Sequence, residues 1–187
     1  IREAFFLTAT SWCLVSVIGA MPFVFSDLQI SLTDAIFESV SGITTTGSTV
    51  LFDLDHKSRG ILLWRSILQW LGGIGIVAFA IVLLPFLRVG GMQLFHMESS
   101  DQSDKALPRT AQIAAAIVVI YVALTLIWSG GLWMAGLSGF DAIAHAMTTI
   151  ATGGFSTHDA SLAYYNSGVV EAITTAGMVV GSLPFLL

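Results

Sequence analysis

The sequence predicts an all-α membrane protein made of repeated units, each with a long helix, a short helix, a polar loop and a second long helix. Its 187 residues are 55% hydrophobic and 10% charged, with a mean hydropathy of +0.85, whereas soluble domains carry about 25% charged residues. Apolar runs of two lengths alternate, and only the longer ones reach the roughly 20 residues that cross a bilayer. The same order of segments occurs twice. Together these observations exclude a soluble domain, and the net charge of -5 argues against a nucleic-acid partner.

The first half is predicted to contain a span at 4–25, a short helix at 32–42, a polar loop at 44–48 and a second span at 59–88. Ser31 or Thr33 can cap the short helix. At 1.5 Å per residue its roughly 11 residues rise only about 17 Å, so we expect it to be re-entrant. The second span exceeds the minimal length and must tilt, bend or protrude.

The second half repeats this order after an aqueous loop at 90–109. It is predicted to contain a span at 110–135, a short helix at 140–150, a polar loop at 151–155 and a span at 169–187. An offset of 107 residues places Asp34 on Asp141 and Gly47 on Gly154. These matches fall at corresponding places in the two halves, so they indicate an internal repeat of membrane units.

Basic residues suggest an orientation for these spans. Four lie on the side of the 90–109 loop and two on the other: Arg2, Arg88, Lys105 and Arg109 against Lys57 and Arg59. Because cytoplasmic loops carry an excess of Lys and Arg, the 90–109 loop is expected to be cytoplasmic.

The two polar loops contain threonine and glycine but no charge. Irregular backbone at membrane depth must be buried in protein or line a water-filled cavity. Carbonyl oxygens facing a narrow axis can replace the water around a cation, and the negative end of the preceding short helix favours it. Ligation by oxygen without carboxylates suits a large monovalent ion. Each loop alone could be an ordinary connection between helices, but two copies in matching places favour an ion passage.

Four stretches resemble the Trk/Ktr/HKT potassium transporters. They are Phe37–Gly47, Gln69–Gly75, Gly90–Leu94 and Ile150–Asp159, the last being similar to the second pore loop of the bacterial TrkH/TrkG branch. The resemblance implies a monomer of four repeats around one pseudo-fourfold pore, each repeat with outer helix, pore helix, filter loop and inner helix. Residues 1–89 and 110–187 would be the first two repeats. Since the sequence starts at Ile1 and ends inside an apolar run, we expect a part of a longer protein.

The resemblance also implies the ligands and partners. Carbonyl groups of the two filter loops would bind K⁺, which is the transported ion, without any other cofactor. The residues concerned are Thr44, Thr45, Thr46, Gly47, Ala151, Thr152, Gly153 and Gly154. The family further implies a multi-pass protein of the bacterial inner membrane, a homodimer, and a cytosolic nucleotide-binding regulatory subunit of the TrkA type that the 90–109 loop could contact.

A membrane scaffold and an intramembrane enzyme are the alternatives to potassium transport. A non-transporting scaffold of glycine-packed helices would not need threonine-rich loops in both halves. An intramembrane enzyme could use Asp141 and His145, which are spaced for one helix face, but it lacks a further catalytic group, and His145 is better explained as a hydrogen-bonded structural residue. We therefore do not expect an enzyme.

Charged and small residues within the second span allow structural predictions. Arg65 can form an ion pair with Glu38 that supports the filter, or it can extend its charge toward the membrane surface. The three glycines within residues 72–75 can serve as packing sites or as a hinge, and packing is the favoured interpretation.

Overall fold

The computed structural model describes residues 2–87 and 106–183. Within these two ranges the chain forms α-helices, two short 3₁₀ helices and no β-strand, which confirms the all-α prediction. The helices are α1 (Arg2–Val24), α2 (Leu32–Ile43), α3 (Arg59–Leu87), α5 (Ala106–Met134), α6 (Gly139–Ile150) and α7 (Gly168–Ser182), with η1 (Leu54–His56) and η2 (Ser161–Tyr165). Most of the expected 90–109 loop lies outside the described residues.

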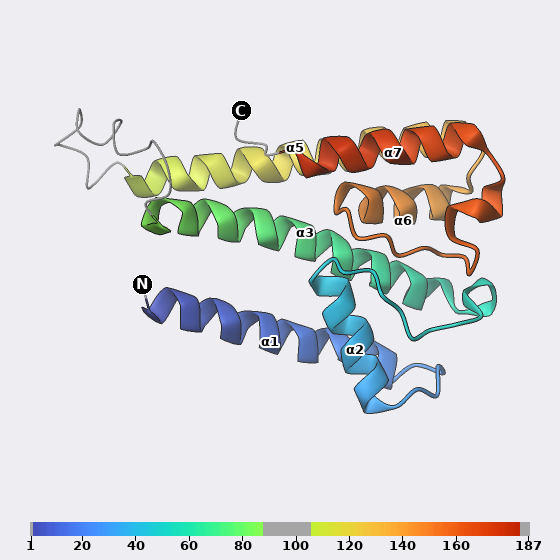
Figure 1. The fold of residues 1–187 in the computed structure, drawn as a ribbon, viewed down its shortest axis with the longest axis horizontal. Helices are drawn as coiled ribbons and strands as arrows, with labels where there is room; N and C mark the ends of the chain where they lie inside the picture. Colours follow the sequence, from blue (N-terminus) through green and yellow to red (C-terminus); the bar gives the residue numbers. More distant parts are fainter. Residues whose placement is uncertain (1, 88–105, 184–187) are drawn as a thin grey trace.

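The long helices α1, α3, α5 and α7 run antiparallel to one another in chain order, and the short helices α2 and α6 pack against them (Figure 1). Helix α3 occupies the middle, with α1 and α2 on one side and α5, α6 and α7 on the other. By length and composition, Phe6–Val24 in α1 and Ala115–Met134 in α5 could each cross a membrane. Because α3 contacts helices of both halves, it connects them.

Each short helix begins at a serine cap followed by an aspartate in the first turn. The amide of Asp34 donates to the Ser31 hydroxyl at 3.1 Å, and the amide of Asp141 donates to the Ser138 hydroxyl at 3.1 Å. The cap satisfies an amide that has no partner inside the helix, and the carboxylate favours the positive end of the helix dipole. Ser31, rather than Thr33, is thus the N-cap of α2.

Two helix ends differ from the sequence-based boundaries. Helix α5 begins at Ala106 instead of residue 110, because Pro108 is tolerated in the first turn, where an amide has no helical partner. Helix α7 ends at Ser182 instead of residue 187, and Leu183 is extended with ψ of 137°. The residue before a proline is disfavoured in the α region, and Leu183 precedes Pro184.

Two consecutive glycines of α3 allow it to pack tightly against the ends of both short helices. A Cβ atom on Gly72 would lie 2.0 Å from the carbonyl oxygen of Ile43, the last residue of α2. A Cβ atom on Gly73 would lie 3.1 Å from the Cα atom of Ala151, just after α6, and 2.4 Å from the Tyr121 hydroxyl. Neither position has room for a side chain, so the interpretation as packing sites is confirmed for Gly72 and Gly73. A Cβ atom on Gly75 would make only ordinary contact with Trp12 at 3.5 Å.

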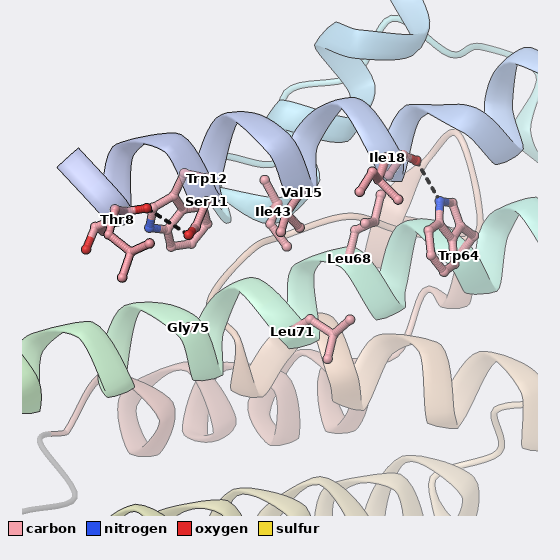
Figure 2. A pocket seen from close by; sticks show the side chains of 12 residues that line it. Thr8, Ser11, Trp12, Val15, Ile18, Ile43, Trp64, Leu68, Leu71 and Gly75 are labelled. Atoms are coloured by element: carbon pink, nitrogen blue, oxygen red, sulfur yellow. Dashed lines mark hydrogen bonds between the residues drawn. The ribbon is translucent and has the colours of Figure 1, made fainter. Parts of the chain in front are cut away.

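An apolar groove separates α1 from α3 over part of their length (Figure 2). Its volume is about 410 Å³, and its lining includes Trp12, Leu68, Leu71 and Ile43. At one end the Trp64 indole donates to the carbonyl oxygen of Gly19 at 2.9 Å and so ties the two helices together. The groove therefore reaches the C-terminal end of α2 from the side of α1.

Candidate functional site

The first polar loop folds back on the end of α2. The amide of Thr45 donates to the carbonyl oxygen of Gly42 at 2.9 Å, and the amides of Thr46 and Gly47 donate to that of Ser41 at 3.0 and 3.4 Å. Thr45 and Gly47 have φ angles of 55° and 78°. Left-handed backbone is costly for threonine, so the helix-end hydrogen bonds must hold this loop in place.

The second polar loop has the same backbone arrangement at the end of α6. The amide of Thr152 donates to the carbonyl oxygen of Thr149 at 2.9 Å, and that of Gly153 donates to Thr148 at 2.8 Å. Thr152 and Gly154 have φ angles of 53° and 82°. Each of these features lies 107 residues after its counterpart in the first loop. The correspondence between the halves thus extends from sequence to individual hydrogen bonds.

These hydrogen bonds determine where the loop carbonyl groups point. In a trans peptide the C=O of one residue points opposite to the N–H of the next, and the described chain has no cis peptide. Because the N–H groups of residues 45–47 and 152–153 point at the helix ends, the preceding carbonyl groups point away from them. Those groups belong to Thr44, Thr45, Thr46, Ala151 and Thr152. Within residues 2–87 and 106–183 their oxygens accept no hydrogen bond.

The two loops touch at their glycines. A Cβ atom on Gly47 would lie 2.0 Å from the carbonyl oxygen of Gly153. The same oxygen accepts a hydrogen bond of 2.9 Å from Nε2 of Gln69, a contact that the sequence did not reveal. A carbonyl oxygen has two lone pairs, so this bond leaves one for another partner. The structure thereby brings the eight predicted residues into two adjoining loops, with Gly153 at the junction.

The hydroxyl of Thr44 anchors the first loop. It donates to the carbonyl oxygen of Val40 at 2.7 Å and lies 2.8 Å from the Thr46 hydroxyl. The Thr44 hydroxyl therefore holds the first loop against the end of α2.

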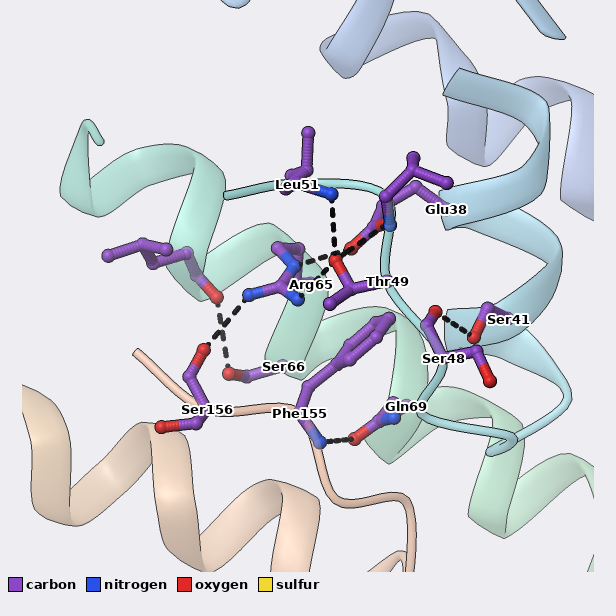
Figure 3. Close-up of polar contacts among 12 residues, drawn as sticks. Glu38, Ser41, Ser48, Thr49, Leu51, Arg65, Ser66, Gln69, Phe155 and Ser156 are labelled. Atoms are coloured by element: carbon purple, nitrogen blue, oxygen red, sulfur yellow. Dashed lines mark hydrogen bonds and ion pairs between the residues drawn. The ribbon is translucent and has the colours of Figure 1, made fainter. Parts of the chain in front are cut away.

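A buried ion pair lies behind the first loop (Figure 3). Nε of Arg65 on α3 donates to Oε1 of Glu38 on α2 at 2.7 Å, and the two side chains are 1% and 0% exposed. The predicted ion pair is confirmed, and the alternative in which Arg65 extends toward the membrane surface is wrong. Because the two charges have opposite signs, the pair places no net charge beside the loops.

The same pair binds the residues that directly follow both loops. Glu38 accepts hydrogen bonds from the Thr49 hydroxyl at 2.8 Å and from the amide of Val50 at 3.0 Å. Arg65 donates to the carbonyl oxygen of Ser156 at 2.9 Å, and its guanidinium lies 4.2 Å from the centre of the Phe155 ring. Arg65 thus connects α2 and the first loop with the second loop, which follows α6.

His145 takes the place in α6 that Glu38 takes in α2. Its Nδ1 lies 2.9 Å from the backbone carbonyl oxygen of Asp141, and its Nε2 lies 3.0 Å from the Ser156 hydroxyl. The Asp141 carboxylate instead accepts hydrogen bonds from Ser138 and Thr157, each at 2.7 Å. The expected structural histidine is confirmed, and no acid–base pair forms between the Asp141 and His145 side chains.

A second connection, which we name the interloop clasp, lies farther along the two loops. It consists of Asp55 and Leu54 from η1 and of His158 and Asp159 from the segment between the second loop and η2. Nδ1 of His158 donates to the Asp55 carboxylate, and the amide of Leu54 donates to Oδ2 of Asp159 at 2.9 Å. The His158 ring stacks on Tyr164 at 3.6 Å between centroids. The clasp therefore joins residues about a hundred positions apart.

We expect the interloop clasp to stabilise the protein above about pH 4 and to be lost in stronger acid. The hydrogen bond from His158 lowers the pKa of the Asp55 carboxyl below its ordinary value. A carboxyl with a lower pKa in the folded state contributes stability above its unfolded pKa of about 3.9, and loses it as the pH falls through the folded value. Asp55→Asn should lower the unfolding temperature at pH 7 and make no difference at the lowest pH.

The check is thermal unfolding of the detergent-solubilised full-length protein across pH. The matched control is Asp53→Asn in the same loop, whose partner His56 forms only an exposed ion pair at 2.6 Å. Exposed pairs contribute little, so this variant should follow the wild type at every pH. An Asp55→Asn difference that persists unchanged into strong acid would contradict the assignment.

Apolar helices of membrane-spanning length, with two short helices that end on matched uncharged loops, are typical of a membrane protein with re-entrant segments. The chain belongs to the TrkH family, described as cation transport protein, whose model matches residues 1–187.

Named relatives and a solved structure agree with this family. The chain is 50% identical over 186 residues to the Trk system potassium uptake protein TrkI of Halomonas elongata, covering 99% of this chain and 38% of the relative. It is 46% identical over 175 residues to the Trk system potassium uptake protein TrkH of Escherichia coli K12, covering 92% and 36%. The crystal structure of the potassium transporter TrkH from Vibrio parahaemolyticus is similar with a TM-score of 0.85 and 41% identity, covering 96% of this chain and 36% of that one. The chain thus spans under two fifths of the length of these relatives.

Proposed function

We propose that this chain supplies two of the four pore repeats of a protein that takes up potassium across the bacterial inner membrane. Residues 1–89 and 110–187 would be the repeats, and residues 90–109 the cytoplasmic loop between them. The observation that carries the proposal is the matched backbone of the two loops, in which helix-end hydrogen bonds turn successive carbonyl groups away from α2 and α6. Relatives named as potassium uptake proteins support the choice of ion.

In this proposal the carbonyl oxygens of the two loops replace the hydration shell of K⁺. The ligand residues are Thr44, Thr45, Thr46 and Gly47 in the first loop and Ala151, Thr152, Gly153 and Gly154 in the second. The C-terminal ends of α2 and α6 lie directly before these loops, where their negative dipole ends favour a cation. Gly153 has a dual role, because its oxygen also accepts the hydrogen bond from Gln69.

Potassium would move passively through these loops, driven by the membrane potential. The loops have no tyrosine and the first has a single glycine, so we expect less strict selectivity than in a Thr-Val-Gly-Tyr-Gly filter and some permeation of sodium. A homodimer and a nucleotide-binding regulatory subunit of the TrkA type belong to the same proposal and rest on the family resemblance alone. The scaffold alternative is not favoured, because packing of helices gives no reason for left-handed Thr45 and Thr152 in both loops.

The test is growth of a potassium-uptake-deficient bacterium on limiting potassium after it receives the complete gene. Restored growth is the expected result, together with saturable uptake of Rb⁺ as a potassium tracer. A matched gene with Gly47→Ser and Gly154→Ser together is expected not to restore growth. Restoration by that double variant would overturn the assignment of the filter, and failure of the expressed wild-type gene would overturn the proposed function.

A further inference from the structure

The side chain of Gln69 connects the central helix to the backbone of the second loop (Figure 3). It is 0% exposed and lies one turn after Arg65 on α3. Its Nε2 donates to the carbonyl oxygen of Gly153 at 2.9 Å, and its Oε1 accepts from the amide of Phe155 at 3.0 Å. A primary amide offers both a donor and an acceptor, so this one side chain fixes two peptide groups.

The two peptide groups that Gln69 holds are those on either side of Gly154. Gly154 has a φ of 82°, a conformation from which glycine can rotate at little cost. In the trans peptide between Gly154 and Phe155, the carbonyl group points opposite to the Phe155 N–H. Since that N–H points at Gln69, the Gly154 carbonyl points away from α3.

Several contacts other than those of Gln69 also dock α3 against the second half. The indole of Trp70 donates to the Thr125 hydroxyl at 3.0 Å, and the Tyr121 hydroxyl donates to the carbonyl oxygen of Trp70 at 3.2 Å. Gly73 packs against Ala151. These contacts join α3 to the second half, whereas the two hydrogen bonds of Gln69 orient the backbone of the second loop.

We propose that Gln69 is a specificity-determining positioning residue, which aims the Gly154 carbonyl and so sets the discrimination between K⁺ and Na⁺. The inference rests on the proposed function, in which that carbonyl is an ion ligand. Selectivity depends on the number and placement of coordinating carbonyl groups. A second loop released from Gln69 can turn the Gly154 carbonyl out of place while the first loop keeps its own hydrogen bonds to α2.

The experiment uses the full-length protein in liposomes and measures K⁺ and Na⁺ uptake separately. Gln69→Met keeps the length of the side chain and removes both hydrogen bonds, and it should lower the K⁺/Na⁺ uptake ratio by about tenfold, the effect of losing hydrogen bonds to buried groups. Gln69→Glu places a carboxyl in this buried site, where its neutral form is favoured. The neutral carboxyl can accept from Phe155 and donate to Gly153, so this variant should lose less of the ratio than Gln69→Met. Gln112→Met, an exposed glutamine on α5, is the control and should keep the wild-type ratio.

A second variant changes Gly153, the residue that accepts the hydrogen bond from Gln69. A Cβ atom on Gly153 would lie 2.3 Å from Cδ of Gln69, so Gly153→Ala should displace the amide and lower the ratio as Gln69→Met does. If both changes act through one contact, the double variant should be no worse than the poorer single variant.

The outcomes separate this inference from the proposed function. A wild-type ratio in folded Gln69→Met, or additive losses in the double variant, would overturn the role of Gln69 while potassium uptake stands. If neither Gln69→Met nor Gln69→Glu accumulates as folded protein, Gln69 is a residue of the fold and the inference fails. Absence of potassium uptake by the wild-type protein would overturn the proposed function itself.

Discussion

Gly47→Ala is expected to reduce potassium uptake by the full-length protein to a small fraction of the wild-type rate. Gly47 has a φ of 78°, which costs alanine about 1–2 kcal/mol. The added Cβ atom would also lie 2.0 Å from the backbone oxygen of Gly153, and no flexible side chain can move to relieve that overlap. One of the two loops must shift, so we expect uptake to fall by roughly 100-fold, which corresponds to about 3 kcal/mol.

The measurement is Rb⁺ uptake, with the amount of folded protein determined in the same cells. Gly136→Ala is the matched control, because Gly136 has a φ of 104° but has no atom within 4 Å of an added Cβ. This variant carries the backbone strain without the overlap and should transport normally. Equal loss of uptake in both variants would show that strain alone, and not contact between the loops, explains the effect.

Arg65→Gln is expected to destabilise the protein by about 3–5 kcal/mol, because it leaves the fully buried Glu38 carboxylate without its partner. The change also removes the hydrogen bond from Arg65 to Ser156, so any folded protein should discriminate less well between K⁺ and Na⁺. The double variant Glu38→Gln with Arg65→Gln carries no buried charge at this site and should recover part of the lost stability. Thermal unfolding in detergent measures the first effect, and uptake ratios measure the second.

Arg59→Gln is the control for the same helix. Arg59 is exposed at the start of α3 and lies 5.5 Å from the centre of the Phe140 ring. Surface substitutions of this kind usually change stability by less than about 0.5 kcal/mol. If Arg65→Gln left both stability and selectivity unchanged, the buried pair would have no supporting role at the loops.

Much of the local structure could be predicted from the sequence because it depends on neighbouring residues. The serine at residue 31 and the aspartate three positions later specify the start of α2, and the length of the apolar run between them and the loop limits the helix to a re-entrant size. The offset that pairs Gly47 with Gly154 follows from comparing the halves. Even the ion pair of Glu38 and Arg65 could be predicted, since a charge within an apolar segment requires a partner.

Only the tertiary structure shows which loop residues the Gln69 and Arg65 side chains of α3 contact. Gln69 reaches Gly153, which lies 84 positions away, and Arg65 reaches Ser156, which lies 91 positions away, so α3 positions the loop of the other half as well as its own. Composition, periodicity and caps are properties of a few adjacent residues. The distance between α3 and the second loop depends instead on how closely helices approach, and Gly72 and Gly73 allow backbone to pack against backbone there. The sequence by itself therefore determined where the helices and the two loops lie along the chain. Close packing at Gly72 and Gly73 determined which residues of α3 contact the loops.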